Sequence, residues 1–423
     1  MNDYALVADR VWDGTADTAQ VGIAVMIHDD RIADLIPHES LSPTLPQVEL
    51  PGCTLIPGLM DAHVHYSAVM GPAFLAAGVT TIRDVGNDLD WILRQRELSK
   101  GDLARGPGIV CCGQLLDGSP AHWQRMGRPH SNTDELRASV REHVARGVDQ
   151  IKLYAHLDLE MVRAGVDEAH GLKKFVVAHL GVAVEDAAVA GLDEFEHLSG
   201  CAVAWRSATQ DEDDTAIDVL LQHNVVIDPT FVVWDRLGRI LDRALHHDAR
   251  RIWAHPCHCD IWNRYVSRFE APAGRLRLQE AMPHLKRFLR RAHERGVVIA
   301  LGTDTPFPHL IPGFSVHDEL AMYADAGLRP IDALRSATSV NAKVLGVAAR
   351  TGKIEAGLMA DLVAIRGNPC ERIDDISNVV LVIREGRRLE IEQLLAAMQE
   401  AAANAPDDPI TNDLLDYVGH RDK

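Results

Sequence analysis

Short apolar runs that follow a glycine recur along the chain. The pattern is clearest in four segments, "AAGVTTIRDVG", "ARGVDQIKLYA", "VAGLDEFEHLS" and "ERGVVIALGTD", whose glycines are Gly78, Gly147, Gly191 and Gly296. In each segment a β-branched or aliphatic run follows the glycine and leads to a polar residue. Because glycine often ends a helix and β-branched runs favour strands, each segment predicts a helix end followed by a strand.

The residues before two of these glycines have helical periodicity. Asn132 and Glu135 give the segment before Gly147 a start that resembles a capping box. Apolar residues then recur at helical spacing, as Leu136, Val140 and Val144 there, and as Leu285, Phe288, Leu289 and Ala292 before Gly296. Helix, glycine and strand in repetition are typical of βα units around a parallel sheet.

Eight strands are predicted from this pattern, near residues 56–64, 79–85, 108–113, 149–154, 175–180, 193–198, 224–229 and 297–303. Eight βα units over roughly 250–300 residues fit a (β/α)8 TIM barrel, so the expected fold class is α/β. A doubly wound open sheet is the alternative, but no glycine-rich phosphate fingerprint follows the first strand.

Both ends of the chain alternate apolar and polar residues like short β-strands. The pattern covers residues 1–55, with "VGIAVMIHDDRIADLI", and residues 351–395, which include "GKIEAGLMADLVAIRGNP". We expect these segments to pair into one small β-sandwich domain beside a barrel formed by 56–350. Residues 396–423 are expected to form an exposed C-terminal helix and an acidic tail.

Composition and charge narrow the classes of partner. The net charge of −18 argues against nucleic acid and anionic membranes. No run approaches the roughly 20 apolar residues of a membrane span, and the start "MNDYALVADRVWDG" lacks the regions of a secretion signal. Seven cysteines without framework spacing fit free thiols in a reducing cytoplasm. We therefore expect a cytoplasmic protein that acts on a small molecule.

Side chains that can bind metals or take part in catalysis lie at the ends of the predicted strands. In "LIPGLMDAHVHYS", His63 and His65 are two positions apart, so on a strand they project to the same face and suit a metal ion. The other strand ends supply Arg83 and Asp84, Lys152, His179, His197 and Asp304. Each alone has a structural interpretation, such as a buried histidine, an ion-paired lysine or a helix-capping aspartate. Together they predict a site at the carboxyl ends of the strands.

A second histidine-rich stretch is not interpreted as a metal site. In "AHPCHCD", residues 254–260, the Cys and His side chains point in different directions on either a helix or a strand. No partner pair at zinc spacing occurs elsewhere. The stretch is assigned to a helical insertion over 231–280. This insertion would cover the mouth of the barrel or contact another subunit.

These strand-end motifs resemble the amidohydrolase superfamily, in particular its imidazolonepropionase-like and prolidase-like binuclear metal-dependent hydrolases. "PGLMDAHVH" resembles the first-strand HxH, "GVDQIKLY" the strand with a carboxylated lysine, "VAHL" and "FEHLSG" the next two histidine strands, and "ALGTDTP" the last-strand aspartate. "GKIEAGLMADLVAIRGNP" resembles the β-sandwich segment that follows the barrel.

The resemblance implies two divalent metal ions. One would be bound by His63, His65, carboxylated Lys152 and Asp304, and the other by Lys152, His179 and His197. A lysine carbamate, formed with carbon dioxide, is a bidentate anion that can bridge two ions, whereas a lysine ammonium is a poor ligand. Zinc is the first expectation, with manganese or cobalt as alternatives.

The implied reaction is hydrolysis of an amide-type C–N bond in an N-acyl amino acid, a dipeptide, a carbamate or a related amide. A metal-bridging hydroxide would attack the carbonyl carbon, and Asp304 would accept a proton and pass it to the leaving amine. Among loop residues, His122 is expected to assist at the substrate carbonyl, and Trp123 and Tyr154 to contact substrate. Trp234 and Phe307 would add an apolar wall. Arg83 is interpreted as a buried partner of an acid that holds the barrel.

Two positions depart from related patterns. Leu180 replaces the second histidine of a His-Ala-His-Gly stretch found in many prolidase-like relatives, which leaves dipeptide specificity open. Val182 stands where related deaminases carry a glutamate, which argues against deamination. The alternatives are a mononuclear cyclic-amide hydrolase or deaminase, a lactonase or phosphotriesterase on the same site, and a non-enzymatic scaffold. A homo-oligomer is expected from the same resemblance.

Overall fold

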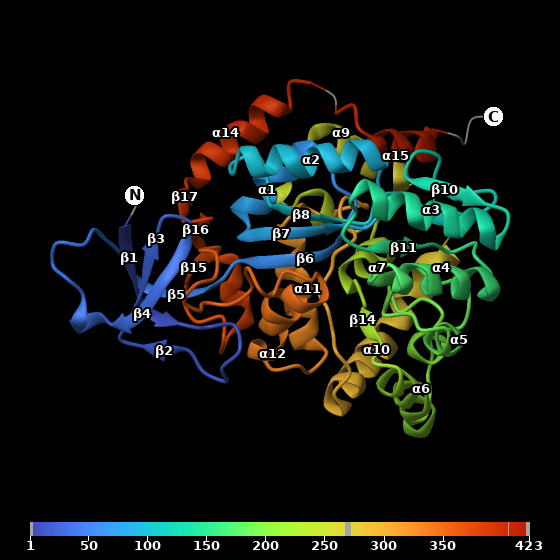
Figure 1. Cartoon of the computed structure of the whole chain (residues 1–423), viewed down its shortest axis with the longest axis horizontal. Coiled ribbons are helices and arrows are strands. Elements are labelled where there is room, and N and C mark those ends of the chain that lie inside the picture. Colours follow the sequence, from blue (N-terminus) through green and yellow to red (C-terminus); the bar gives the residue numbers. More distant parts are fainter. Residues whose placement is uncertain (1–2, 267–271, 405, 420–423) are drawn as a thin grey trace.

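The computed structural model describes residues 3–266, 272–404 and 406–419. Within these ranges the chain has a mixed α/β fold, with one large mixed sheet and two parallel sheets (Figure 1). Among the described residues, no helix combines the length and the apolar character needed to cross a membrane.

The large sheet joins the two ends of the chain. Its path runs β17-β16-β15-β5-β1-β3-β4, with β2 paired to β1. The strands are β1 (Asp3–Val11), β2 (Gln20–Val21), β3 (Ile23–His28), β4 (Arg31–Pro37), β5 (Gln47–Pro57), β15 (Leu362–Arg366), β16 (Val379–Arg384) and β17 (Arg387–Leu389). β15 pairs antiparallel to β5, with Ala364 opposite Leu55. A sheet built from both ends is consistent with the small β-domain expected from their alternating pattern.

The parallel strands follow the glycine-led repeats of the sequence. One sheet contains β6 (Leu59–Val64), β7 (Val79–Asp84) and β8 (Gly108–Cys111). The other runs β10-β9-β11-β12-β13-β14, with β9 (Leu115–Gly118), β10 (Gly127–His130), β11 (Ile151–Leu153), β12 (Val176–Ala178), β13 (Glu194–Glu196) and β14 (Val226–Asp228). Seven of the eight expected strands thus appear. The loop after β8 adds β9 and β10, which the sequence analysis did not anticipate.

The eighth expected strand, 297–303, is an extended segment with isolated bridges. Ile299 bridges Ile227 of β14, and Thr305 bridges Val64 of β6. Backbone hydrogen bonds reinforce both contacts, from Ala300 N to Ile227 O (2.9 Å) and from Ala62 N to Leu301 O (2.8 Å). At the other junction, Asp149 N donates to Cys111 O of β8 (2.9 Å).

Helices lie around the parallel strands, as Figure 1 shows. They are α1 (Gly71–Ala76), α2 (Leu89–Gly101), α3 (Thr133–Arg146), α4 (Leu159–Gly171), α5 (Val184–Val189), α6 (Gln210–Gln222), α7 (Phe231–Gly238), α8 (Arg243–His246), α9 (Pro256–Tyr265), α10 (Pro272–Arg295), α11 (Phe314–Asp325), α12 (Pro330–Arg335) and α13 (Asn341–Val344). The largest apolar cluster, with residues such as Phe195, Ile227 and Phe288, fills the space between strands and helices. Burial of these side chains is the main driving force for this packing.

The described residues after β17 form two packed helices and not an exposed tail. α14 (Ile391–Ala401) packs against α1, and α15 (Pro409–Gly419) packs against α9. The two helices run along one side of the molecule from the large sheet toward β10 (Figure 1). Within α15, Ile410 and Leu414 are buried, so this helix is part of the folded body.

Candidate metal centre

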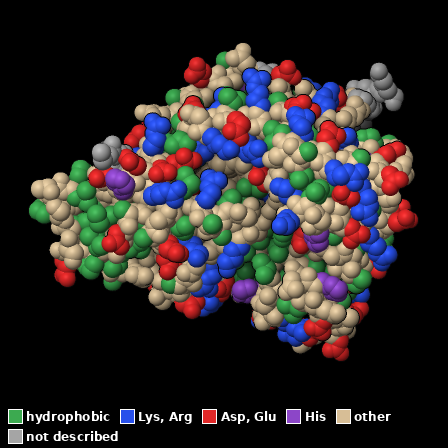
Figure 2. All heavy atoms as spheres, viewed as in Figure 1, with side chains coloured by type: hydrophobic (Ala, Val, Ile, Leu, Met, Phe, Trp, Pro, Cys, Tyr) green, Lys and Arg blue, Asp and Glu red, His purple; other side chains and the backbone are tan. Residues whose placement is uncertain are grey.

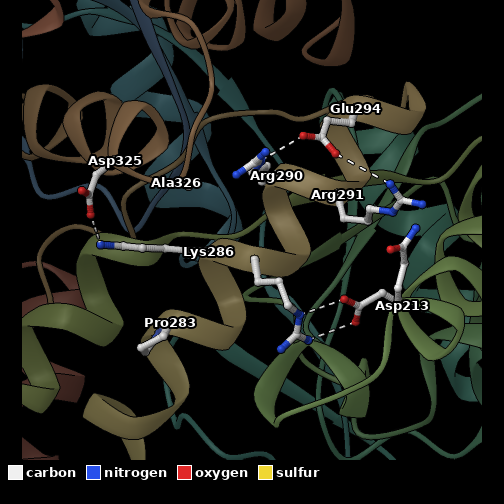
Figure 3. A pocket seen from close by; sticks show the side chains of 10 residues that line it. Asp213, Pro283, Lys286, Arg290, Arg291, Glu294, Asp325 and Ala326 are labelled. Atoms are coloured by element: carbon white, nitrogen blue, oxygen red, sulfur yellow. Dashed lines mark hydrogen bonds and ion pairs between the residues drawn. The ribbon is translucent and has the colours of Figure 1, made fainter.

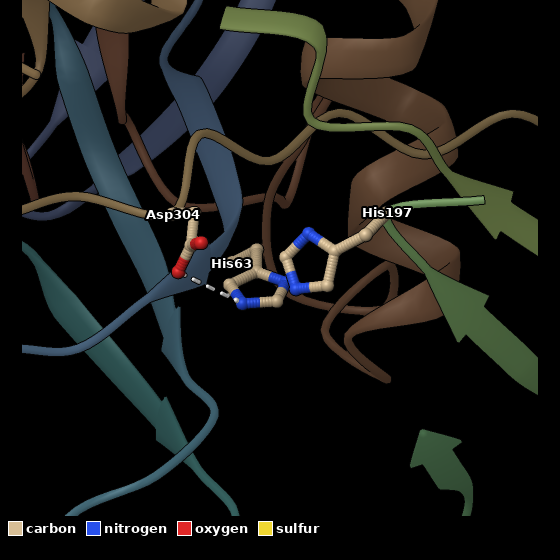
Figure 4. A group of neighbouring side chains, drawn as sticks. All are labelled: His63, His197 and Asp304. Carbon is tan, nitrogen blue, oxygen red and sulfur yellow. Dashed lines mark ion pairs between the residues drawn. The ribbon is translucent and has the colours of Figure 1, made fainter. Parts of the chain in front are cut away.

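Three side chains from separate parts of the chain meet at the ends of the parallel strands. His63 belongs to β6, His197 directly follows β13, and Asp304 lies in the segment after the eighth strand position. One side-chain donor atom from each lies within 4.8 Å of the other two, and all three residues are buried (Figure 4). Nε2 of His63 is 3.3 Å from Oδ1 of Asp304. Nitrogen and carboxylate donors at this spacing are a suitable set for a divalent ion.

His65 and His179 extend this group on two sides. Nε2 of His65 lies 3.5 Å from the same Oδ1 of Asp304. The ring centroid of His179 lies 4.7 Å from that of His197, whose ring lies 4.5 Å from that of His63. His65 is buried, and His179 is half-buried. The structure therefore brings all four expected histidines and Asp304 into one cluster.

The backbone conformation of two of these residues directs their side chains toward the cluster. His197 has φ 64° and Asp304 has φ 65°, in the left-handed region that non-glycine residues seldom adopt. Each residue stands where a strand path ends, so the turn directs its side chain toward the cluster. Close packing also requires Gly302, because a Cβ there would lie 2.3 Å from Oδ2 of Asp228 and 2.4 Å from Cβ of His63. Such strained positions are common at functional sites.

Lys152 lies beneath the histidines and contacts Glu196. Both side chains are fully buried, and the Lys152 ammonium forms an ion pair with Oε2 of Glu196. The other oxygen of Glu196, Oε1, lies 2.9 Å from Nδ1 of His63. Glu196 is not among the residues predicted from the sequence, although two glutamates two positions apart on an apolar strand, Glu194 and Glu196, point to the same face and are a visible signal.

Two histidines have Nδ1 held by a hydrogen bond, and Nδ1 of a third, His63, lies near a carboxylate without hydrogen-bond geometry. Nδ1 of His65 lies 2.9 Å from the carbonyl oxygen of Gly86, and Nδ1 of His197 lies 2.7 Å from Oγ1 of Thr230. Nδ1 of His63 meets Glu196. A partner at Nδ1 favours the tautomer with its proton there and leaves the Nε2 lone pair for a metal ion. This arrangement is the one expected of histidine ligands.

Burial sets the protonation of the cluster. It lowers the pKa of His65 to about 4 and that of His179 to about 3, so both rings are neutral at pH 7. It also lowers the pKa of Lys152 to about 7, which makes the neutral amine accessible near neutral pH. Burial raises the pKa of Asp304 well above its usual value. Bound cations would oppose that shift, because they favour the carboxylate.

The residues present fit a metal ion. Oδ1 of Asp304 is buried, and among the described residues it receives no hydrogen bond. A buried acceptor without a partner is unfavourable unless a ligand satisfies it. Since this oxygen lies near Nε2 of both His63 and His65, a divalent ion between the three atoms would pair all of them.

A second polar layer lies deeper between the strands. Arg83 forms an ion pair with Glu194 and donates to Oε1 of Gln150 (2.9 Å) and to the carbonyl oxygen of Ala62 (2.6 Å). Arg83 thus contacts an acid inside the fold, as expected, and that acid is Glu194. The hydroxyl of Thr303 donates to Asp61 (2.6 Å), which ties β6 to the segment that carries Asp304.

The expected substrate residues lie on one side of the cluster. Nε1 of Trp123 donates to the hydroxyl of Tyr154 (3.2 Å), and the Tyr154 ring is 5.0 Å from that of His179. Phe307 lies 6.0 Å from both the Trp123 and His65 rings. His122 is exposed and packs its ring 5.0 Å from Trp123. The structure therefore links these loop side chains to the metal cluster through ring contacts.

Helix α15 borders the same loop, which the sequence analysis did not anticipate. The Tyr417 ring lies 5.4 Å from Trp123 and 6.4 Å from His122. The buried carboxylate of Asp413 accepts hydrogen bonds from the backbone N–H groups of Arg125 (3.0 Å) and Met126 (2.9 Å). No local sequence signal connects positions almost 300 residues apart.

The stretch 254–260 serves packing, in line with its interpretation as part of a helical insertion. Nδ1 of His255 accepts from the Cys257 N–H at the start of α9 (3.1 Å). Nε2 of His258 lies 3.0 Å from the hydroxyl of Thr411 in α15. Both histidines thus help to hold the C-terminal helices.

Comparisons with known proteins agree with this architecture. The model of the amidohydrolase family matches residues 54–389. No curated protein matches the chain significantly. Similar solved structures include a bottromycin amidohydrolase (23% identity, 97% of this chain and 92% of that one, TM-score 0.76).

Two further structures are a Xaa-Pro dipeptidase with bound methionine (23% identity, 92% of this chain and 100% of that one, TM-score 0.73) and the ochratoxinase of A. niger (18% identity, 92% and 95%, TM-score 0.70). At these identities the likeness to solved structures shows a shared fold.

Proposed function

The chain belongs to the amidohydrolase family, and on that premise we propose that it is a binuclear metal-dependent hydrolase of amide-type C–N bonds. Its substrate would be an N-acyl amino acid, a dipeptide, a carbamate or a related amide. The observation that carries the proposal is a fully buried lysine, Lys152, close to four histidines and an aspartate at the ends of parallel strands. A lysine that served only in a structural ion pair would not need four histidines and an aspartate close to it.

The proposal assigns ligands to two ions, with zinc as the first expectation. His63, His65, Asp304 and carboxylated Lys152 would hold one, and His179, His197 and the same lysine the other. When bound, such ions polarise a carbonyl oxygen and lower the pKa of water toward about 7. Carbon dioxide would add to the neutral Lys152 amine, with formation of one N–C bond and loss of one proton. The N–H that remains would face Glu196.

The chain's own residues account for the proton movements. Asp304 would take a proton from the attacking water on its carboxylate and deliver it to the leaving amine nitrogen, the usual role of a general base and acid. Glu196 would hold His63 with Nε2 toward the cluster, because its carboxylate meets Nδ1. From the exposed loop, His122 would donate a hydrogen bond to the substrate carbonyl. Trp123 and Tyr154 would contact the substrate.

A closed (β/α)8 barrel is part of the proposal. Its support is the set of backbone contacts at both junctions between the parallel sheets: Asp149 to Cys111 on one side, and the bridges of Ile299 and Thr305 on the other. In such barrels the residues at the carboxyl ends of the strands form the active site, where the cluster lies. The domain limits, a homo-oligomeric state and a cytoplasmic location remain predictions from sequence.

Elemental analysis of protein purified without chelators tests the proposal. About two divalent ions per chain are expected, together with turnover of a member of an amide and carbamate panel. One ion per chain would favour a mononuclear cyclic-amide hydrolase or deaminase instead. Preferred turnover of esters or phosphotriesters would indicate a lactonase or phosphotriesterase. Absence of metal after reconstitution would overturn metal-dependent hydrolysis.

A further inference from the structure

A hollow of about 570 Å³ lies at the end of the parallel strands opposite the metal cluster. Its walls come from the start of β8, from the residues that precede β11 and β12, and from the segment 343–350. We call it the basal hollow. Six basic side chains line it: Arg96, Lys100, Lys173, Lys174, Lys343 and Arg350. Figure 2 shows Lys and Arg side chains gathered around a hollow in the region of β8 and α2.

The charge of the basal hollow is not balanced. Asp149 is the one acidic residue that lines it, and it forms an ion pair with Arg96 (2.9 Å). Lys100 pairs with Glu97 outside the hollow, and Lys174 donates to the carbonyl oxygen of Val148. Within the described ranges, Lys173 and Lys343 form no ion pair with a carboxylate, whereas Arg350 lies near enough to Asp361 and Glu385 to interact with them electrostatically. The described lining residues thus include six cations and one carboxylate, with Glu97, Asp361 and Glu385 as further carboxylates close by, in a chain of net charge −18.

Another basic hollow on the molecule shows what a balanced one looks like. It lies along α10 and contains four basic side chains of that helix (Figure 3). Each has a carboxylate partner: Lys286 with Asp325, Arg287 with Asp213, Arg290 with Glu294, and Arg291 with Asp214. Cations in that hollow are used for surface ion pairs. In the basal hollow Arg96 and Lys100 have such partners, but Lys173 and Lys343 have none within the described ranges, so a bound anion would relieve the repulsion between these cations.

Apolar side chains also line the basal hollow. Ile109, Val110 and Leu345 are buried there, and Phe175 is half-buried. Cations beside apolar side chains match a ligand that joins a multiply charged anion to a flat apolar group. The volume falls within the usual range for small-molecule sites, roughly 300–1,000 Å³.

We propose that the basal hollow binds an organic polyphosphate, such as a nucleoside triphosphate. The phosphate oxygens would meet Lys173, Lys343 and Arg350, since lysine and arginine are the side chains that bind phosphate best. The flat apolar group would lie against Phe175. This site is separate from the metal cluster and does not depend on the proposed hydrolysis.

Titration calorimetry with magnesium-free adenosine triphosphate and with inorganic tripolyphosphate tests the proposal. The double variant K343Q/R350Q changes two exposed side chains and is expected to bind adenosine triphosphate about tenfold more weakly or worse, with an unchanged unfolding temperature. K286Q/R290Q, which removes two cations from the balanced hollow, is the matched control and is expected to bind like the wild type. Phe175→Ala is expected to weaken the nucleotide and not tripolyphosphate.

Two results would overturn the proposal. Undiminished nucleotide binding by K343Q/R350Q would place the phosphate elsewhere, for example on the metal ions. No measurable binding of either probe by the wild type would show that the basal hollow holds no polyphosphate.

Discussion

Nδ1 of His63 lies 2.9 Å from Oε1 of Glu196, inside the fold and beneath the metal cluster. Because the second oxygen of this carboxylate contacts Lys152, Glu196 lies against two of the proposed ligands at once. Residues that orient metal ligands typically change affinity or activity about 10–100-fold when replaced.

Glu196→Gln is therefore expected to lower metal content and kcat about 10–100-fold while the chain stays folded. Metal per chain by elemental analysis and kcat on the best amide of the panel are the measurements. Glu392→Gln, an exposed position on α14, serves as the control. Full metal content and full kcat in Glu196→Gln would show that this carboxylate does not position the ligands.

Lys152→Ala is expected to remove the bridge between the two ions and at least about 99% of the activity, because one anionic ligand of both ions is lost. A short carboxylic acid such as propionate should restore part of the rate by occupying the vacant position. Lys100→Ala, at an exposed site, should keep the wild-type rate. Wild-type rate and metal content in Lys152→Ala would rule out the carbamate.

Asp304→Asn is expected to reduce kcat about 10²–10⁴-fold, the usual contribution of a general acid or base. The unfolding temperature should change little, because no described residue donates a hydrogen bond to Oδ1 of Asp304. Steady-state kinetics and thermal unfolding of the same preparation separate the two effects. A variant that fails to fold would show that the role of Asp304 is structural.

Asp84 is expected to make the free energy of unfolding depend on pH. Its burial decides whether that free energy rises or falls with pH. Burial raises its pKa to about 7 in the folded protein, against about 3.9 in an unfolded chain. Between these values the folded state keeps a proton that the unfolded state has lost, so this group's contribution falls as pH rises from about 4 to about 7. Asp84→Asn removes that change.

The measurement is the difference in unfolding free energy between wild type and Asp84→Asn at several pH values and a fixed zinc concentration. The wild type is expected to lose on the order of 2 kcal/mol relative to the variant between pH 5 and pH 8. A constant difference, or one that grows with pH in favour of the wild type, would contradict this account.

Helix α15 is expected to influence substrate binding through Asp413. Its carboxylate holds the N–H groups of Arg125 and Met126 in the loop that carries His122 and Trp123. Asp413→Asn should raise KM about tenfold with a smaller effect on kcat, since hydrogen bonds to a charged group contribute about 1.5–3 kcal/mol. Asp416→Asn is the matched control, because Asp416 pairs with the exposed side chain of Arg125 only. Equal KM values for the two variants would mean that α15 does not position the loop.

Local patterns in the sequence determined where most of the parallel strands lie and that the first two proposed metal ligands share a face. A strand alternates with period two, so His63 and His65 had to share a face wherever that strand lay. Glycine-ended helices likewise placed Lys152 and His197 on strands that lead to the site. The same pattern predicted a last strand at 297–303, which in the structure makes isolated bridges and not a regular strand.

Only the tertiary structure decided which of these residues meet and what surrounds them. The contacts of Glu196 with Lys152 and His63 depend on how neighbouring strands are staggered, which short-range periodicity does not encode. The contact of Asp413 with Arg125 joins positions 288 residues apart. The charge excess of the basal hollow arises from segments around residues 96, 174 and 343 that pack together only in the fold. Burial then set the protonation states, because desolvation depends on neighbours from the whole chain.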